Sequence, residues 1–192
     1  MKFSFKKILE GLIYLWPSSW GGVLIRKVWG RNTFLEFGEG VYFGDRLTIR
    51  DAGFISIGNR TVVMSGCYLY ANSKGSLRIG DDCSLNHNIY LGADDGGIHV
   101  GNHVLIGPNT VIRAANHCFS NPNQPISRQG HHGAEIRIQD DVWIGANCTI
   151  LPGVEIGVGT IVGAGSVVNK SLPSMSVCVG TPAKKVKARG AY

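Results

Sequence analysis

His117 lies where a regular six-residue repeat of the chain stops, and the repeat resumes only at Ile138. Imidazole takes up a proton near neutral pH, so a histidine held at the edge of a rigid element is well placed to act as a general base. The alternative is a solvated histidine at a corner of the fold. Cys118 follows directly, but neighbouring residues of a strand point to opposite sides, which disfavours a thiol nucleophile at the same place.

The interruption is a polar insertion over residues 118–137 that contains His131 and His132. A long loop in an otherwise tight repeat is usually functional or disordered, so we expect a role at the surface. The two histidines are expected to be loop residues that at most contact a substrate.

The repeat itself consists of hexads that begin with an aliphatic residue or Phe, often followed by Gly, and that group in threes. The triplets start at Phe37, Ile57, Ile79, Val100, Ile138 and Ile156, at intervals of 20, 22, 21, 38 and 18 residues. Each interval is one coil of 18 residues plus an insertion. This pattern predicts a triangular β-solenoid of six coils, with one hexad per side and the first residue of each hexad in the core.

Composition places few further limits on the 192-residue chain. Its 27 glycines indicate many tight turns. The net charge of +6 is concentrated at the two ends, which we expect to meet anionic partners. A nucleic-acid partner is not predicted, because aromatic and basic residues do not alternate along any segment.

The five cysteines form no C-x-x-C pair, which argues against a disulfide framework and favours a reducing, cytoplasmic location.

The first residues predict an amphipathic helix over residues 3–16, stopped by Pro17. The apolar positions at helical spacing are Phe5, Ile8, Leu9, Leu12, Ile13 and Trp16. Two roles stay open: the helix covers the end of the solenoid, or it makes a peripheral contact with an anionic membrane. We expect neither a signal peptide nor a membrane span.

Three segments, DVWIGANCTILPGVEIG, VGAGSVV and VGTPAKKV, occur in this order from Asp141 to Val186. With the hexads, they resemble the left-handed parallel β-helix acyltransferases, and among these the sugar O-acetyltransferases. The resemblance covers about residues 35 to 187. It implies a left-handed coil, acetyl-CoA as acyl donor, a homotrimer with each site between two protomers, and His117 as the catalytic base.

The resemblance also implies acceptor-binding and donor-binding residues. Those expected to contact the acceptor are Asn86, with Asn88 as its rival, and the acidic pair Asp94 and Asp95. Those expected to contact the donor are Trp143, Gly145, Ala146, Ala164, Lys184 and Lys187. Small residues let an extended pantetheine arm approach the backbone, and the lysines, together with Lys185 and Arg189, would neutralise the phosphates of coenzyme A. A backbone N–H near Gly145 and Ala146 is the candidate donor to the oxyanion.

The predicted fold is therefore all-β, a left-handed parallel β-helix of about six three-hexad coils with an N-terminal helical segment and a long inserted loop. The expected parts are a helical cap over residues 1–33, an acyltransferase domain over 34–173 and a basic C-terminal segment over 174–192. The predicted activity is acetyl-CoA-dependent O-acetylation of a sugar hydroxyl in surface polysaccharide synthesis, on a sugar or lipid-linked saccharide at the inner face of the cytoplasmic membrane. No metal is expected.

Two alternatives to this activity stay open. One is a γ-class carbonic anhydrase-like zinc enzyme, for which His87, His99, His103 and His117 are available. The other is a β-solenoid scaffold without catalytic activity.

Overall fold

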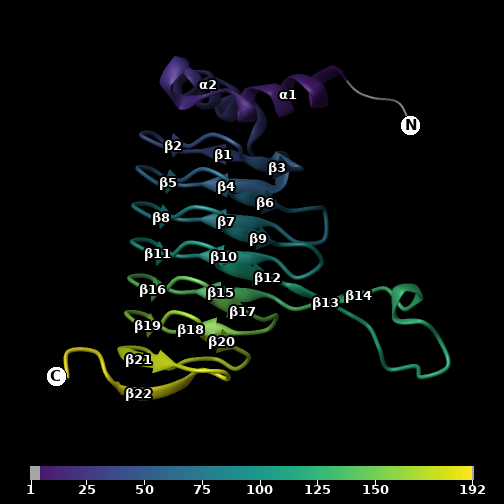
Figure 1. The fold of residues 1–192 in the computed structure, drawn as a ribbon, viewed down its shortest axis with the longest axis vertical. Coiled ribbons are helices and arrows are strands. Elements are labelled where there is room, and N and C mark those ends of the chain that lie inside the picture. Colours follow the sequence, from purple (N-terminus) through teal and green to yellow (C-terminus); the bar gives the residue numbers. More distant parts are fainter. Residues whose placement is uncertain (1–4, 192) are drawn as a thin grey trace.

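The computed structural model describes residues 5–191. The chain winds as a parallel β-solenoid with three sheets running along its axis (Figure 1). The first face contains β1 (Glu36–Phe37), β4 (Ile55–Ile57), β7 (Leu77–Ile79), β10 (Ile98–Val100), β15 (Ile136–Ile138) and β18 (Glu155–Ile156). The second contains β2 (Tyr42–Phe43), β5 (Val62–Val63), β8 (Ser84–Leu85), β11 (Leu105–Ile106), β16 (Trp143–Ile144), β19 (Ile161–Val162), β21 (Ser176–Val179) and β22 (Lys184–Ala188). The third contains β3 (Thr48–Arg50), β6 (Tyr68–Tyr70), β9 (Tyr90–Gly92), β12 (Val111–Arg113), β17 (Thr149–Ile150) and β20 (Val167–Val168).

The strand register confirms the predicted alignment of the hexads. Phe37 pairs with Ile57, Ile57 with Ile79, and each later triplet start with the next, so every insertion is looped out at a corner. Seventeen of the eighteen hexad starts are buried, and Phe37 is partly buried against the same core. The core is therefore a column of stacked aliphatic side chains.

The corners between the second and third faces are built from small residues and from Asn in the left-handed conformation. Asn88, Asn109 and Asn147 have φ values of 57°, 59° and 56° and follow one another up this edge. Asn tolerates this conformation better than most residues with a side chain. A β-carbon on Gly145 would lie 2.5 Å from the Ala164 nitrogen, so consecutive coils touch backbone to backbone there.

The long insertion is a β-hairpin arm that projects sideways from the solenoid (Figure 1). Its strands are β13 (Ala115–His117) and β14 (His131–Gly133), and a short 3-10 helix, η3 (Ile126–Arg128), lies in the connection between them. The expectation of a structureless loop beginning after His117 was wrong. The chain leaves the third face before Ala115, so His117 belongs to the arm and not to the coil.

The N-terminal segment folds as α1 (Phe5–Leu15), η1 (Ser18–Trp20) and α2 (Gly22–Thr33), which lie across one end of the solenoid (Figure 1). The helix predicted over residues 3–16 corresponds to α1 and ends before Pro17, as expected; residues 3 and 4 lie outside the described residues. Another short 3-10 helix, η2 (Ala52–Phe54), lies in the first coil's insertion. None of the described helices has the length and hydropathy to cross a membrane.

Aromatic and buried polar contacts attach this cap to the first coil. Tyr14 and Phe34 each pack against Phe43, with ring centroids 6.4 and 5.6 Å apart. Arg26 is fully buried and donates to the Phe43 and Trp16 carbonyl oxygens at 3.0 and 2.5 Å. Burial lowers the pKa of this guanidinium, although the nearby Asp45 opposes the shift.

Candidate active site

The hairpin arm places two histidines side by side. His117 on β13 is directly opposite His131 on β14, and in an antiparallel pair such residues project to the same side. Their ring centroids are 4.2 Å apart, with an angle of 37° between the planes. His132 is opposite Asn116 and projects to the other side. The interpretation of His131 as an ordinary loop residue was therefore wrong, because the strand register across the long connection was not visible in the sequence.

The root of the arm is in close contact with the insertion of the coil before it. A β-carbon on Gly133 would lie 2.2 Å from the carbonyl carbon of Asp95, and one on Gly96 would lie 2.4 Å from the Ala114 oxygen. Both positions require glycine. These contacts fix the direction in which the arm leaves the solenoid.

Asp94 is buried next to this root, with 8% of its surface exposed. One carboxylate oxygen, Oδ2, accepts a hydrogen bond from Nη2 of Arg113 at 3.1 Å. Its other oxygen, Oδ1, and Nε of Arg113 have no partner among the described residues. A buried polar atom without a partner costs roughly 1–3 kcal/mol, so this pair can gain free energy from a polar ligand. Arg113 is the last residue of β12, and it was not among the site residues predicted from the sequence.

Asp95 has a different environment from Asp94. It adopts a left-handed conformation with φ of 58° and lies 3.6 Å from Nζ of Lys74, so it is a turn residue with a weak ion pair. Tyr90 lies near both Asp94 and Arg113. A β-carbon on Gly92 would be 2.7 Å from the Tyr90 ring and 3.3 Å from Asp94 Oδ1, so both side chains border the space left by this glycine. Burial raises the pKa of Tyr90, which keeps its hydroxyl protonated.

The two asparagines of the third coil also have different environments. Asn88 occupies the left-handed corner position, and its amide nitrogen donates to Oδ1 of Asn109 at 3.2 Å. Asn86 is exposed and has no such conformation; its Oδ1 accepts from the His87 N–H at 2.8 Å. The structural role of Asn88 is thus clear, and Asn86 is the better candidate for contact with an acceptor.

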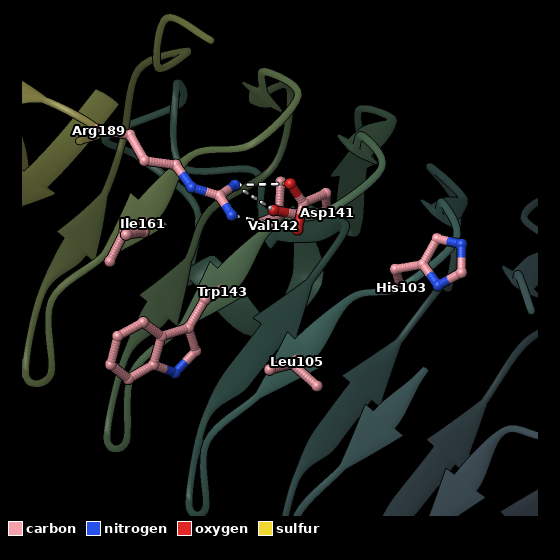
Figure 2. Close-up of a pocket in the computed structure, with 7 residues that line it drawn as sticks. All are labelled: His103, Leu105, Asp141, Val142, Trp143, Ile161 and Arg189. Carbon is pink, nitrogen blue, oxygen red and sulfur yellow. Dashed lines mark hydrogen bonds and ion pairs between the residues drawn. The ribbon is translucent and has the colours of Figure 1, made fainter. Parts of the chain in front are cut away.

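The predicted donor residues follow the second face and its edge with the third. Trp143 projects outward from β16 and is 52% exposed. It lines a shallow pocket of about 160 Å³ (Figure 2), whose other lining residues are His103, Leu105, Asp141, Val142, Ile161 and Arg189. Arg189 had been expected to contact phosphates, but its Nη1 is 2.6 Å from Oδ2 of Asp141. The ion pair borders the pocket beside Trp143.

The basic C-terminal run forms an edge strand of the second face and includes a β-bulge. Lys184 is opposite Val179 and Lys187 is opposite Val177, with the bulge between the two pairs. Residues three apart on a regular strand would project to opposite sides, but the extra residue puts both lysines on one side. Lys185 is opposite the buried Cys178, so its side chain projects to the other side of β22.

The predicted site residues therefore fall into two groups on one protomer. His117 and Asp94 lie beyond the end of the third face, where the chain passes to the first face. Asn86, Ala146 and Ala164 lie at the edge between the second and third faces, beside the second face that carries Trp143. A single protomer does not bring the two groups together.

Two of the other histidines, His99 and His103, lie in separate surface contacts. Nε2 of His99 is 3.2 Å from Glu135, and Nδ1 of His103 is 3.9 Å from Asp82. Within residues 5–191, no three His, Cys, Asp or Glu side chains form a group that could hold a metal ion.

The chain matches known proteins over most of its length. Residues 135–170 match the family model "Bacterial transferase hexapeptide (six repeats)". A galactoside O-acetyltransferase of Lactococcus lactis is 40% identical over 114 residues, which cover 59% of this chain and 54% of that protein. The WbbJ protein of Escherichia coli (strain K12), named as a lipopolysaccharide biosynthesis O-acetyl transferase, is 32% identical over 72% of this chain and 74% of its own length. This chain belongs to the hexapeptide-repeat acyltransferases.

Solved structures of hexapeptide-repeat acyltransferases agree with this assignment. A mutant of AntD, an N-acyltransferase from Bacillus cereus solved with dTDP-4-amino-4,6-dideoxyglucose and coenzyme A, superposes with a TM-score of 0.77. The two chains are 30% identical, over 86% of this chain and 89% of AntD. The predicted fold class, a left-handed parallel β-helix, is confirmed. The chain spans about half the length of the galactoside O-acetyltransferase that it matches.

Proposed function

We propose that this protein transfers an acetyl group from acetyl-CoA to a hydroxyl group of a sugar, in the synthesis of a surface polysaccharide. The observation that carries the proposal is the hairpin arm, which holds His117 beside His131 and whose root packs against the insertion that contains the incompletely bonded Asp94. Relatives named as O-acetyltransferases of galactosides and of lipopolysaccharide biosynthesis support the sugar acceptor. AntD, solved with coenzyme A, supports the donor.

In the proposed reaction His117 is the general base. It removes the proton of the acceptor hydroxyl while the oxygen bonds to the carbonyl carbon of the thioester. The tetrahedral intermediate then collapses, the C–S bond breaks, and the sulfur of coenzyme A leaves with the proton that His117 took up. General base catalysis of this kind contributes about 10²–10⁴-fold. His131 is a positioning residue that restricts the His117 ring.

The oxyanion of the intermediate needs a hydrogen-bond donor. The Gly145 N–H already donates to the Val162 carbonyl at 2.8 Å, so it is not available. The neighbouring Ala146 N–H is the better candidate for this role.

On the acceptor side, Asp94 and Asn86 have the appropriate chemistry for sugar hydroxyls. The unpartnered Oδ1 of Asp94 accepts a hydroxyl proton, and the Asn86 side chain both donates and accepts. On the donor side, the close-packed edge at Ala146 and Ala164 leaves room for a pantetheine chain next to the backbone. Lys184 and Lys187 on one side of β22 suit the phosphates of coenzyme A.

The working unit in this proposal is a homotrimer with three sites between protomers. One protomer holds the base and the donor track at different edges, so a neighbour must supply one of them for the reacting groups to meet. Cyclic three-fold symmetry provides three identical sites from one interface.

The decisive test is transfer of labelled acetyl-CoA to panels of acceptors: simple sugars, nucleotide-linked sugars, including an amino sugar, and lipid-linked oligosaccharides. We expect an O-acetyl ester on one saccharide class. Acylation of the amino sugar alone would replace O-transfer by N-transfer. Hydration of CO₂ that depends on bound zinc would favour the carbonic anhydrase-like alternative. No transfer to any acceptor and no binding of coenzyme A by calorimetry would favour a scaffold.

A further inference from the structure

Helix α1 is oriented with its apolar stripe away from the protein. Leu9, Leu12 and Trp16 lie at the spacing of one helix face, and all are exposed, as is Leu15 beside them. Tyr14 is on the opposite side of the helix and is 2% exposed, packed against the first coil. Of the two roles left open for this helix, the exposed positions Leu9, Leu12 and Trp16 do not serve to cover the core.

Helix α2 has the same orientation. Leu24, Ile25 and Val28 are exposed, with 57% for Val28, whereas Gly22 and Arg26 on the other side are buried. The buried side of α2, together with Tyr14 and Phe34, covers the end of the solenoid core. Helices α1 and α2 lie next to each other at the same end of the solenoid (Figure 1), and both expose large apolar side chains.

We call this the apolar end surface: Leu9, Leu12, Leu15, Trp16, Leu24, Ile25 and Val28. Large apolar side chains are normally scattered on a surface, and a contiguous patch marks an interaction site. Helices with leucine and tryptophan on one side and lysine or arginine around them are typical of segments that lie in the interface of a bilayer.

The charge around the apolar end surface indicates what it meets. In the sequence, residues 1–31 contain six Lys or Arg and a single acidic residue, Glu10, and one of the six, Arg26, is buried inside the cap. Lys27 is partly exposed at the edge of the α2 stripe, one turn before Arg31, which is partly neutralised by Glu39 at 2.6 Å. Two copies joined through this end would bring like charges together, whereas anionic headgroups would neutralise them.

We propose that the apolar end surface docks the protein on an anionic lipid bilayer, with α1 and α2 lying in the headgroup region. The solenoid then stands on the membrane by its N-terminal end. The proposal does not depend on the acetyltransferase activity, because it rests on the cap alone.

The test is flotation of the purified full chain with vesicles of phosphatidylglycerol and phosphatidylcholine, compared with pure phosphatidylcholine, at low and high salt. We expect binding to the anionic vesicles that weakens with salt. The double variant Leu12→Glu with Val28→Glu should bind at least about 10-fold more weakly, because a carboxylate in each stripe opposes insertion. Lys27→Gln should reduce the dependence on anionic lipid.

Val158→Glu is the matched control, since Val158 is 45% exposed on the last coil, far from the cap. It should bind vesicles as the wild type does, and circular dichroism should show that both proteins keep their fold. The proposal is overturned if the wild type does not float with anionic vesicles, or if Val158→Glu loses as much binding as the double variant. If the wild type does not float and the double variant has a lower molar mass than the wild type in light scattering, the apolar end surface joins copies of the chain instead.

Discussion

At the scale of single residues, the arrangement of His117 and His131 is the feature with the most direct chemical consequence. The two rings are held together by strand register, and their surroundings differ from those of His132 on the same arm. The reactivity of a side chain depends on such surroundings.

His117→Ala should lower kcat by at least about 10²-fold while leaving acetyl-CoA binding nearly unchanged, because a general base acts on the transition state and not on the donor. Steady-state kinetics and calorimetry measure the two effects. His132→Ala is the control in the same arm and should retain most of the activity. Wild-type turnover in His117→Ala would remove the base from the mechanism.

The cysteines should differ sharply in their reaction with thiol reagents. Burial raises the pKa of Cys67 to about 11 and also raises the pKa of the Cys83 and Cys148 thiols, and Cys178 is fully buried. The thiolate is the reactive form, so at pH 8 only the partly exposed Cys118 should be alkylated by iodoacetamide. Mass spectrometry should find one modified residue in the native protein and five after denaturation. Rapid native labelling at Cys67 would contradict the packing of the core.

At the scale of elements, three segments outside the regular hexads determine what the surface offers: the arm, the cap and strand β22. Each has an orientation set by a specific pairing. In β22 the bulge opposite Val177 and Cys178 puts Lys184 and Lys187 on one side.

Neutralising Lys184 and Lys187 together with Gln should weaken binding of coenzyme A several-fold, and more than binding of dephospho-CoA, because a phosphate contact is charge-assisted. Raising the salt concentration should remove the difference. Isothermal titration with both ligands measures it. Lys185→Gln, on the other side of the strand, should have a smaller effect. Equal losses for the two ligands in the double variant would argue against a contact with the 3′-phosphate.

At the scale of the whole molecule, His117 and the candidate donor residues lie at different edges of one protomer, and for this reason the proposed mechanism includes a homotrimer. The solenoid is a rigid prism, so the two edges cannot approach each other within one protomer. In the proposed mechanism a second protomer supplies the missing half of the site.

Complementation between inactive variants tests this assembly. His117→Ala protein and a variant carrying Trp143→Ala with the two lysine changes should each be inactive. After dissociation and random reassembly at equal amounts, about a quarter of all sites, that is about one site in each mixed trimer, would combine two intact halves, and activity should return to that extent. No recovery despite demonstrated subunit exchange, or full activity of a monomer, would contradict a shared site.

The sequence by itself determined the solenoid, its register and the identity of the candidate base. Hexads with apolar first residues leave one arrangement that buries them all, so Phe37, Ile57 and Ile79 had to stack. A repeating pattern predicts this because each coil packs on a copy of itself. The break at His117 was visible for the same reason.

Tertiary structure decided which side the irregular segments present and what they meet. His131 became a partner of His117 through a pairing across the whole connection of the arm, and Asp94 acquired Arg113 through the neighbouring coil. Helix α1 buried Tyr14 and left Leu9, Leu12 and Trp16 outside, a choice that the amphipathic pattern alone had left open. These outcomes depend on contacts between residues distant in sequence that do not repeat, so no periodic signal records them, and only the packed molecule specifies them.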